Sequence, residues 1–114
     1  MRAKKSLGQN FLSDKNILNN IVSHGNISKE DIILEIGPGT GNLTERILEK
    51  EPKNLIVVEK DNILASSLKN KFGSKLEIIN DDILNCYNNL KFSKPIIIYG
   101  NLPYNVSTKI LISF

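Results

Sequence analysis

Three glycines at alternate positions, Gly37, Gly39 and Gly41, follow the short apolar run Ile32–Ile36 and precede a stretch with helical spacing. This order predicts a strand, a tight turn and a helix. Because glycine lacks a Cβ, a ligand can lie directly against the backbone here, beside the free N–H groups at the start of the helix. The chemistry that such a loop serves is nucleotide binding. A glycine-rich turn without a ligand is the alternative.

The glycine spacing departs from the dinucleotide-binding fingerprint. That fingerprint has a third glycine three residues after the second, and Asn42 stands at that position here. A wider loop of this kind suits a ligand without a pyrophosphate, such as S-adenosylmethionine, better than it suits NAD.

Acidic residues follow the next two predicted strands. Glu59 lies 22 residues after Gly37, at the end of an apolar run, where a carboxylate can accept hydrogen bonds from both ribose hydroxyls of an adenosine. Asp81 and Asp82 follow the third predicted strand, and either can accept a hydrogen bond from the exocyclic amine of adenine. A solvated turn is the alternative role for each acid. The carboxyl ends of parallel strands meet at one edge, so the glycines and these acids should converge.

The most specific passage is Asn101, Leu102, Pro103 and Tyr104, which follows the predicted fourth strand at residues 95–99. The exocyclic amine of adenine is a poor nucleophile because its lone pair is delocalised into the ring. Hydrogen bonds to the Asn101 side-chain oxygen and to a carbonyl near Leu102 or Pro103 would favour a pyramidal nitrogen. Tyr104 would stack on the extruded base. A β-turn with a buried tyrosine is the alternative.

Residues 2–12 have neither helical nor strand periodicity, and we expect them to form an ordered arm. Their composition alone favours a loop that packs Phe11 and Leu12 onto the core.

The elements that must position these residues form one domain. The chain has 114 residues, of which 40% are apolar, and its formal charge of +3 with a pI near 9.0 is only a mild basic bias.

Cys86 is the only cysteine, and no Cys/His cluster has metal-ligand spacing, so we expect neither disulfides nor a metal. No apolar run approaches the length of about 20 residues that a membrane span requires. We expect a cytoplasmic protein.

Periodicity predicts an α/β order. Helices are expected from Ser13 or Asp14 to Gly25, after the glycine loop, from Asn62 to Phe72 with Ile63 facing inward, and briefly after residue 82. Strands are expected at residues 32–36, 55–58, 76–79 and 95–99. The sequence therefore predicts a parallel sheet of about four strands flanked by helices.

These passages resemble the KsgA-type ribosomal RNA adenine dimethyltransferases, over essentially the whole chain. The motifs that carry the resemblance lie at residues 8–12, 35–41, 58–61 and 101–108. The resemblance implies a Rossmann-like fold and S-adenosylmethionine as cofactor. It further implies dimethylation of the exocyclic N6 of two adjacent adenosines near the 3′ end of small-subunit (16S) ribosomal RNA, during ribosome maturation.

The resemblance also implies roles for single residues. It places the arm over the cofactor site, with contacts from Asn10 and Leu12, instead of packing it on the core. It assigns Asp82, rather than Asp81, to the adenine, and puts Asn101 near the transferred methyl group. The cofactor-binding set implied is Asn10, Leu12, Gly37, Gly39, Gly41, Glu59, Asp82 and Asn101, and the catalytic set is Asn101, Leu102, Pro103 and Tyr104.

Members of that family are more than twice this length and complete a seven-stranded sheet before a small helical domain that helps to engage RNA. We therefore expect residues 1–114 to be the amino-terminal part of the catalytic domain, with Phe114 in a helix just past the catalytic loop. We expect a monomer for the full-length enzyme, and poor stability or self-association for the isolated piece.

Two other functions are compatible with the sequence. One is a non-catalytic RNA-binding or ribosome-assembly relative, or an inactive truncated form, of the same fold. The other is a large-subunit ribosomal RNA methyltransferase of the antibiotic-resistance type, which would share the cofactor chemistry. An NAD-dependent oxidoreductase is disfavoured by the glycine spacing and by the lack of a suitable proton-transfer pair.

Overall fold

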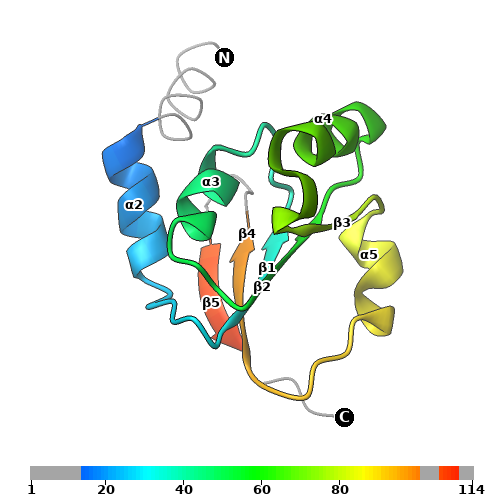
Figure 1. Cartoon of the computed structure of the whole chain (residues 1–114). Helices are drawn as coiled ribbons and strands as arrows, with labels where there is room; N and C mark the ends of the chain where they lie inside the picture. Colours follow the sequence, from blue (N-terminus) through cyan, green and yellow to red (C-terminus); the bar gives the residue numbers. More distant parts are fainter. Residues whose placement is uncertain (1–13, 101–105, 111–114) are drawn as a thin grey trace, which may run out of the picture.

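A five-stranded sheet organises the chain (Figure 1). The computed structural model describes residues 14–100 and 106–110. The strand order is β3-β2-β1-β4-β5, in which β1 to β4 are parallel and β5 is antiparallel to β4. The strands are β1 (Ile32–Ile36), β2 (Asn54–Val58), β3 (Glu77–Ile79), β4 (Ile96–Gly100) and β5 (Val106–Ile110). The four parallel strands confirm the sheet predicted from the sequence.

Helices cover both faces of this sheet. They are α2 (Lys15–Ser23), α3 (Asn42–Leu48), α4 (Asn62–Phe72), the 3-10 helix η1 (Gly73–Lys75), α5 (Ile83–Cys86) and the 3-10 helix η2 (Tyr87–Asn89). In Figure 1, α2 and α3 lie on one side of the sheet and α5 on the other. Alternate residues of β1 serve the two sides: Ile33 packs with the α2 and α3 side chains, and Leu34 packs with Cys86 and Phe92.

The strand order changes direction between β1 and β4. From β1 the chain moves outward through β2 to β3, and then returns to the other side of β1 as β4. The carboxyl ends of β1 and β4 are neighbours, because Ile36 pairs with Gly100. In open α/β sheets, ligands bind at such a switch point, outside the carboxyl ends of the strands. The fold therefore directs attention to the edge that carries the glycine loop.

Residues 106–110 form a strand, so the helix predicted just past the catalytic loop is wrong over these residues. β5 runs antiparallel to β4, with Tyr99 opposite Ser107 and Gly100 opposite Val106. Two physical reasons favour the strand. Val106, Thr108 and Ile110 are β-branched, and pairing satisfies the backbone N–H and C=O groups along the edge of β4.

Aspartates begin three of the helices. Asp14 accepts hydrogen bonds from the backbone N–H groups of Asn16 and Ile17 at the start of α2, and Asp61 does the same for Ile63 and Leu64 at the start of α4. Asp14, and not Ser13, is thus the cap of α2.

The inward face of α4 differs from the prediction at one residue. Ile63 is 80% exposed, while Ala65, Leu68 and Phe72 are the buried residues of the helix. Ile63 lies in the first turn of α4, beside the capping Asp61. The prediction that Ile63 faces inward is wrong.

Candidate functional site

The glycine loop connects β1 to α3 through backbone conformations that favour glycine. Gly37, Gly39 and Gly41 have φ values of 68°, 61° and 91°. The Gly37 N–H donates to the Val58 carbonyl at 2.9 Å, and the Gly41 N–H donates to the Pro38 carbonyl at 3.0 Å. The first of these bonds ties the loop to the carboxyl end of β2. The strand, turn and helix predicted from the glycine spacing are confirmed.

Glu59 lies directly against this loop. Its Oε1 accepts a hydrogen bond from the Gly39 N–H at 3.1 Å, and its Oε2 accepts one from the Asp61 N–H at 3.0 Å. The side chain is only 5% exposed. The structure thus brings together the two features that the sequence places 20 residues apart, as the convergence of strand ends predicts. Each carboxylate oxygen has two lone pairs. Besides these N–H donors, Glu59 can therefore accept hydrogen bonds from two hydroxyl groups of a sugar.

The end of β3 is tied to the same place. The Asn80 side-chain amide donates to the Glu59 carbonyl at 3.0 Å, which holds the acids that follow β3 beside those that follow β2. Asp82 Oδ1 accepts from the Leu84 N–H at 2.9 Å and caps α5, while Asp81 Oδ1 accepts from the Asp82 N–H at 2.7 Å. Both side chains are half-buried. Asp82 therefore has a structural role, because its Oδ1 caps α5. Its other oxygen, Oδ2, takes no part in this cap.

Gly41 has a packing role that the sequence did not reveal. A Cβ at this position would lie 2.8 Å from Phe72 Cε2 and 3.0 Å from Leu68 Cδ2. These are side chains of α4, so the absence of a Cβ lets the start of α3 approach α4 closely. The sequence does not predict this contact, because Gly41 and Phe72 are far apart in the chain and meet only in the folded structure.

Glu35 is the acidic residue of this region to which sequence reasoning gave no role. Its side chain is fully buried, and its Oε1 accepts a hydrogen bond from the Thr44 hydroxyl at 2.6 Å. Burial, together with the nearby negative charge of Glu59, raises the pKa of Glu35 from 4.5 to about 7, although the Thr44 hydrogen bond opposes the rise. An acid at an inward position of an apolar strand was the available signal.

Six residues predicted to serve the site lie outside the described residues: Asn10, Leu12, Asn101, Leu102, Pro103 and Tyr104. Their roles stay predictions. Within the described part, β4 ends at Gly100, which pairs with Ile36 immediately before the glycine loop.

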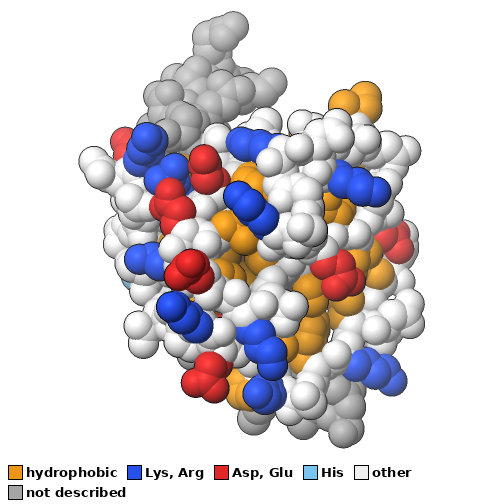
Figure 2. Space-filling view, viewed as in Figure 1, with side chains coloured by type: hydrophobic (Ala, Val, Ile, Leu, Met, Phe, Trp, Pro, Cys, Tyr) orange, Lys and Arg blue, Asp and Glu red, His pale blue; other side chains and the backbone are white. Residues whose placement is uncertain are grey.

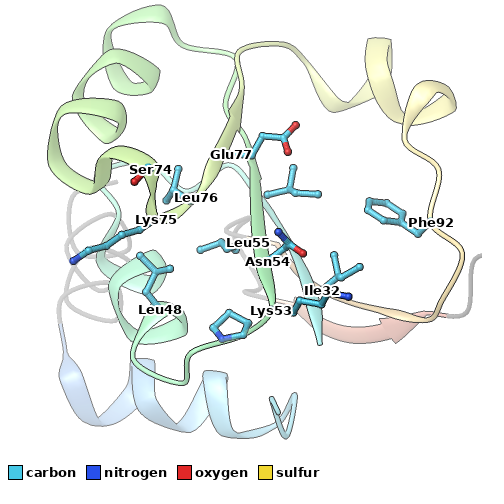
Figure 3. A pocket seen from close by; sticks show the side chains of 12 residues that line it. Ile32, Leu48, Lys53, Asn54, Leu55, Ser74, Lys75, Leu76, Glu77 and Phe92 are labelled. Atoms are coloured by element: carbon cyan, nitrogen blue, oxygen red, sulfur yellow. The ribbon is translucent and has the colours of Figure 1, made fainter. Parts of the chain in front are cut away.

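A cavity lined by described residues lies at the opposite edge of the sheet (Figure 3). This cavity of about 420 Å³ is lined by side chains near the amino ends of the strands, including Ile32, Asn54 and Glu77, and by Leu48 and Lys75. Parallel strands place these residues far from the glycine loop. The cavity is therefore not the ligand site that the sequence predicts.

Charge does not single out a nucleic-acid surface on the face shown in Figure 2. Lysine and arginine side chains alternate there with aspartate and glutamate side chains. Within residues 14–100 and 106–110, no group of three or more His, Cys, Asp or Glu side chains could hold a metal ion. No helix in the same residues is long and apolar enough to span a membrane.

Comparison with known proteins identifies related sequences and structures. The family model described as ribosomal RNA adenine dimethylase matches residues 1–114. The Ribosomal RNA small subunit methyltransferase A of Pelagibacter ubique (strain HTCC1062) is 54% identical over 111 residues, which are 97% of this chain and 42% of that protein. The chain spans less than half of the length of this curated relative, as it does for a second one from Sulfurihydrogenibium sp. (strain YO3AOP1).

Two solved structures are similar to the described fold. The crystal structure of the 23S rRNA methyltransferase ErmE has a TM-score of 0.66 and 26% sequence identity, covering 76% of this chain and 35% of that one. An S-adenosylmethionine-dependent methyltransferase from Clostridium acetobutylicum ATCC 824 has a TM-score of 0.57 and 27% identity, covering 76% of this chain and 36% of that one.

Proposed function

This chain belongs to the ribosomal RNA adenine dimethylase family, and from that premise we propose that it contributes the S-adenosylmethionine site of an enzyme that dimethylates adenosine N6 in ribosomal RNA. Its sheet and helices have the Rossmann-like fold of S-adenosylmethionine-dependent methyltransferases, which confirms the fold predicted from the sequence. The observation that carries the proposal is the contact of Glu59 with Gly39 at the carboxyl edge of the sheet.

The described residues fit the cofactor. Positive φ values at Gly37 and Gly39 present backbone rather than side chains to a ligand, and Glu59 holds two acceptor oxygens beside them. We assign Glu59 to the ribose hydroxyls and the second oxygen of Asp82 to the adenine amine. Gly41 serves the site through its packing on α4. The cofactor, when bound, supplies an electrophilic methyl group.

The substrate side of the proposal rests on residues 101–104. The Asn101 side-chain oxygen and a carbonyl near Leu102 or Pro103 accept hydrogen bonds from the adenine amine and hold it pyramidal. Tyr104 stacks on the base, a contact of about 1–3 kcal/mol. No strong general base is needed, because the nitrogen is cationic when its proton departs. Asn10 and Leu12 complete the cofactor side in this proposal.

We propose small-subunit ribosomal RNA as the substrate, with two adjacent adenosines near its 3′ end as the target. The 54% identity to a protein named as a small-subunit methyltransferase supports this choice. The likeness to a 23S rRNA methyltransferase, at 26% identity, supports the large-subunit alternative more weakly. The proposal implies a cytoplasmic enzyme that acts on immature small subunits. We further propose that residues 1–114 are the amino-terminal part of its catalytic domain, and that the whole enzyme is a monomer.

Methyl transfer tests the proposal directly. The full-length enzyme that the proposal implies, with this chain as its amino-terminal part, is incubated with methyl-labelled S-adenosylmethionine and either unmethylated small subunits or unmethylated large-subunit RNA, and label in N6,N6-dimethyladenosine is measured. We expect label in the small subunits only, and none with the Asn101→Ala variant. Label in the large-subunit RNA would favour the resistance-type alternative. Cofactor binding without any transfer would favour the non-catalytic alternative.

A further inference from the structure

Glu35 is a buried residue near the end of β1, next to the glycine loop. It lies on β1 two residues before Gly37, and its neighbours in register are Val57 on β2 and Tyr99 on β4. Its relative exposure is 0%. Val57 and Tyr99 belong to the apolar cluster between the sheet and helices α2 and α3. A carboxyl group here is therefore enclosed between an apolar core and the loop that we assign to the cofactor.

The two oxygens of this carboxyl group have different surroundings. Oε1 accepts the hydrogen bond from the Thr44 hydroxyl at 2.6 Å, and this bond joins β1 to the first turn of α3 across the glycine loop. Oε2 is buried and has no hydrogen-bond partner among the described residues. A buried oxygen without a donor is tolerated far better in a neutral acid than in a carboxylate.

The titratable groups that face Glu35 do not compensate a negative charge. From the end of β2, Glu59 adds a second negative charge. From β4, the Tyr99 hydroxyl donates to the Val22 carbonyl on α2 at 2.7 Å. From α3, the group in contact is the neutral Thr44 hydroxyl, and the nearby Arg46 pairs with Glu45 and Glu49. While no cation occupies the loop, the raised pKa of Glu35 thus favours its protonated form below a pH of about 7.

We propose that Glu35 is a positioning residue that releases its proton when a sulfonium cofactor binds to the glycine loop, an inference that rests on the proposed function. The sulfonium sulfur is bonded to the 5′ carbon of the ribose, so a ribose held by Glu59 brings a positive charge to this loop. That charge favours the carboxylate, and the O–H bond of Glu35 breaks heterolytically, leaving its electron pair on oxygen and passing the proton to solvent. The ionised Glu35 then accepts a stronger hydrogen bond from Thr44 and fixes the loop.

The proposal separates two ligands that differ in one charge. S-adenosylmethionine carries the sulfonium, whereas S-adenosylhomocysteine has a neutral thioether in its place. Affinity for the sulfonium ligand should rise by up to about tenfold per pH unit, in the range where the free protein holds the proton and the complex does not. Affinity for the thioether ligand should rise much less, because it lacks the sulfonium charge, whereas the α-ammonium and α-carboxylate groups are common to both ligands.

The test is isothermal titration calorimetry of both ligands into the wild-type chain and the Glu35→Gln variant, at several pH values between about 5.5 and 8. Each titration is repeated in two buffers of different ionisation enthalpy, which counts the protons released. We expect wild type to release more protons with the sulfonium ligand than with the thioether ligand. Glutamine has the same shape and no acidic proton, so this excess should vanish in the variant, and the gap in affinity from wild type should widen as pH rises.

A second variant covers the case in which Glu35→Gln does not fold. Thr44→Val removes the hydroxyl that favours the carboxylate, so the pH range of proton release should move upward while release persists. Equal release and equal pH dependence for both ligands in wild type would overturn the inference, even if the sulfonium ligand binds well. Failure of both ligands to bind at every pH would instead overturn the proposed function, and this inference with it.

Discussion

The two edges of the sheet differ in how their polar groups are arranged. At the carboxyl edge, side chains and backbone from successive strands bond to one another: Glu59 contacts Gly39, and Asn80 contacts the Glu59 carbonyl. At the amino edge, the strands and neighbouring segments line a cavity of about 420 Å³ whose charged lining residues, Lys53, Lys75 and Glu77, are exposed.

This difference shows that, in this molecule, the presence of a cavity does not by itself mark a functional site. A cavity forms wherever the packing of neighbouring elements leaves space. A buried carboxylate in contact with a glycine backbone forms only when several strand ends supply groups of matching chemistry. The edge with preorganised polar groups is the better candidate for recognition, although the cavity of about 420 Å³ lies at the other edge.

Removing Glu59 should have the largest effect on ligand binding. Glu59→Ala deletes the acceptor that we assign to two ribose hydroxyls, and hydrogen bonds to a charged group contribute about 1.5–3 kcal/mol each. We expect the affinity for S-adenosylmethionine to fall by at least about 100-fold, or about 3 kcal/mol, as measured by calorimetry.

Glu77→Ala is the matched control at the amino edge. Glu77 is exposed and lines the cavity, so its removal should change the affinity by less than about twofold and stability by less than about 0.5 kcal/mol. Equal losses in both variants would break the comparison between the edges, and a larger loss for Glu77→Ala would reverse it.

The stability of the carboxyl edge should depend on pH through Glu35. Its pKa is raised from 4.5 to about 7 in the fold, so between these values the folded chain holds a proton that the unfolded chain has lost. The free energy of unfolding should therefore decrease as pH rises through this range, by up to about 3 kcal/mol. Urea denaturation at intervals of pH measures the change. The Glu35→Gln variant should lack this dependence, and an unchanged slope would contradict the assignment to Glu35.

Adding one methyl group to the glycine loop should destabilise the fold. In Gly41→Ala the new Cβ meets Phe72 at 2.8 Å, and the residue keeps a φ of 91° that non-glycine residues rarely adopt. We expect a loss of about 2–3 kcal/mol in the free energy of unfolding. Gly73→Ala is the control, because its φ is 59° but no atom lies within 4 Å of the added Cβ. Because Gly73 also has a ψ of −130°, that variant should lose about 1–3 kcal/mol from backbone strain alone, without a steric clash.

The sequence predicted those features that depend on local pattern and on strand order. The contact of Glu59 with the glycine loop followed from two apolar runs, a glycine turn and the rule that parallel strands end together. Features that depend on distant partners were not accessible. The packing of Gly41 on Phe72 joins residues that are far apart in the sequence. The partner of β5 is close in the sequence, and this pairing was missed because a helix was expected there. No role was predicted for Glu35, because an apolar run predicts a strand but does not show that the acid within it is buried.

The smallest expected effects concern the acids after β3, and they separate two roles of one residue. Asp82 caps α5 through Oδ1, and we assign its other oxygen to the adenine amine. Asparagine caps helices as well as aspartate, whereas alanine does not. Asp82→Asn should therefore keep the free energy of unfolding within about 0.5 kcal/mol of wild type, while Asp82→Ala loses about 1 kcal/mol. Thermal denaturation of both variants measures this difference.

Cofactor affinity should follow a different order, since it depends on the acceptor and not on the cap. Asp82→Asn and Asp82→Ala should each weaken binding of S-adenosylmethionine by roughly tenfold, the equivalent of one hydrogen bond. Asp81→Asn is the matched comparison, because Asp81 bonds to the Asp82 N–H within the same turn. Its affinity should fall less than that of Asp82→Asn. If instead Asp81→Asn weakens binding and Asp82→Asn does not, the adenine contact belongs to Asp81, and Asp82 is left with its helix cap alone.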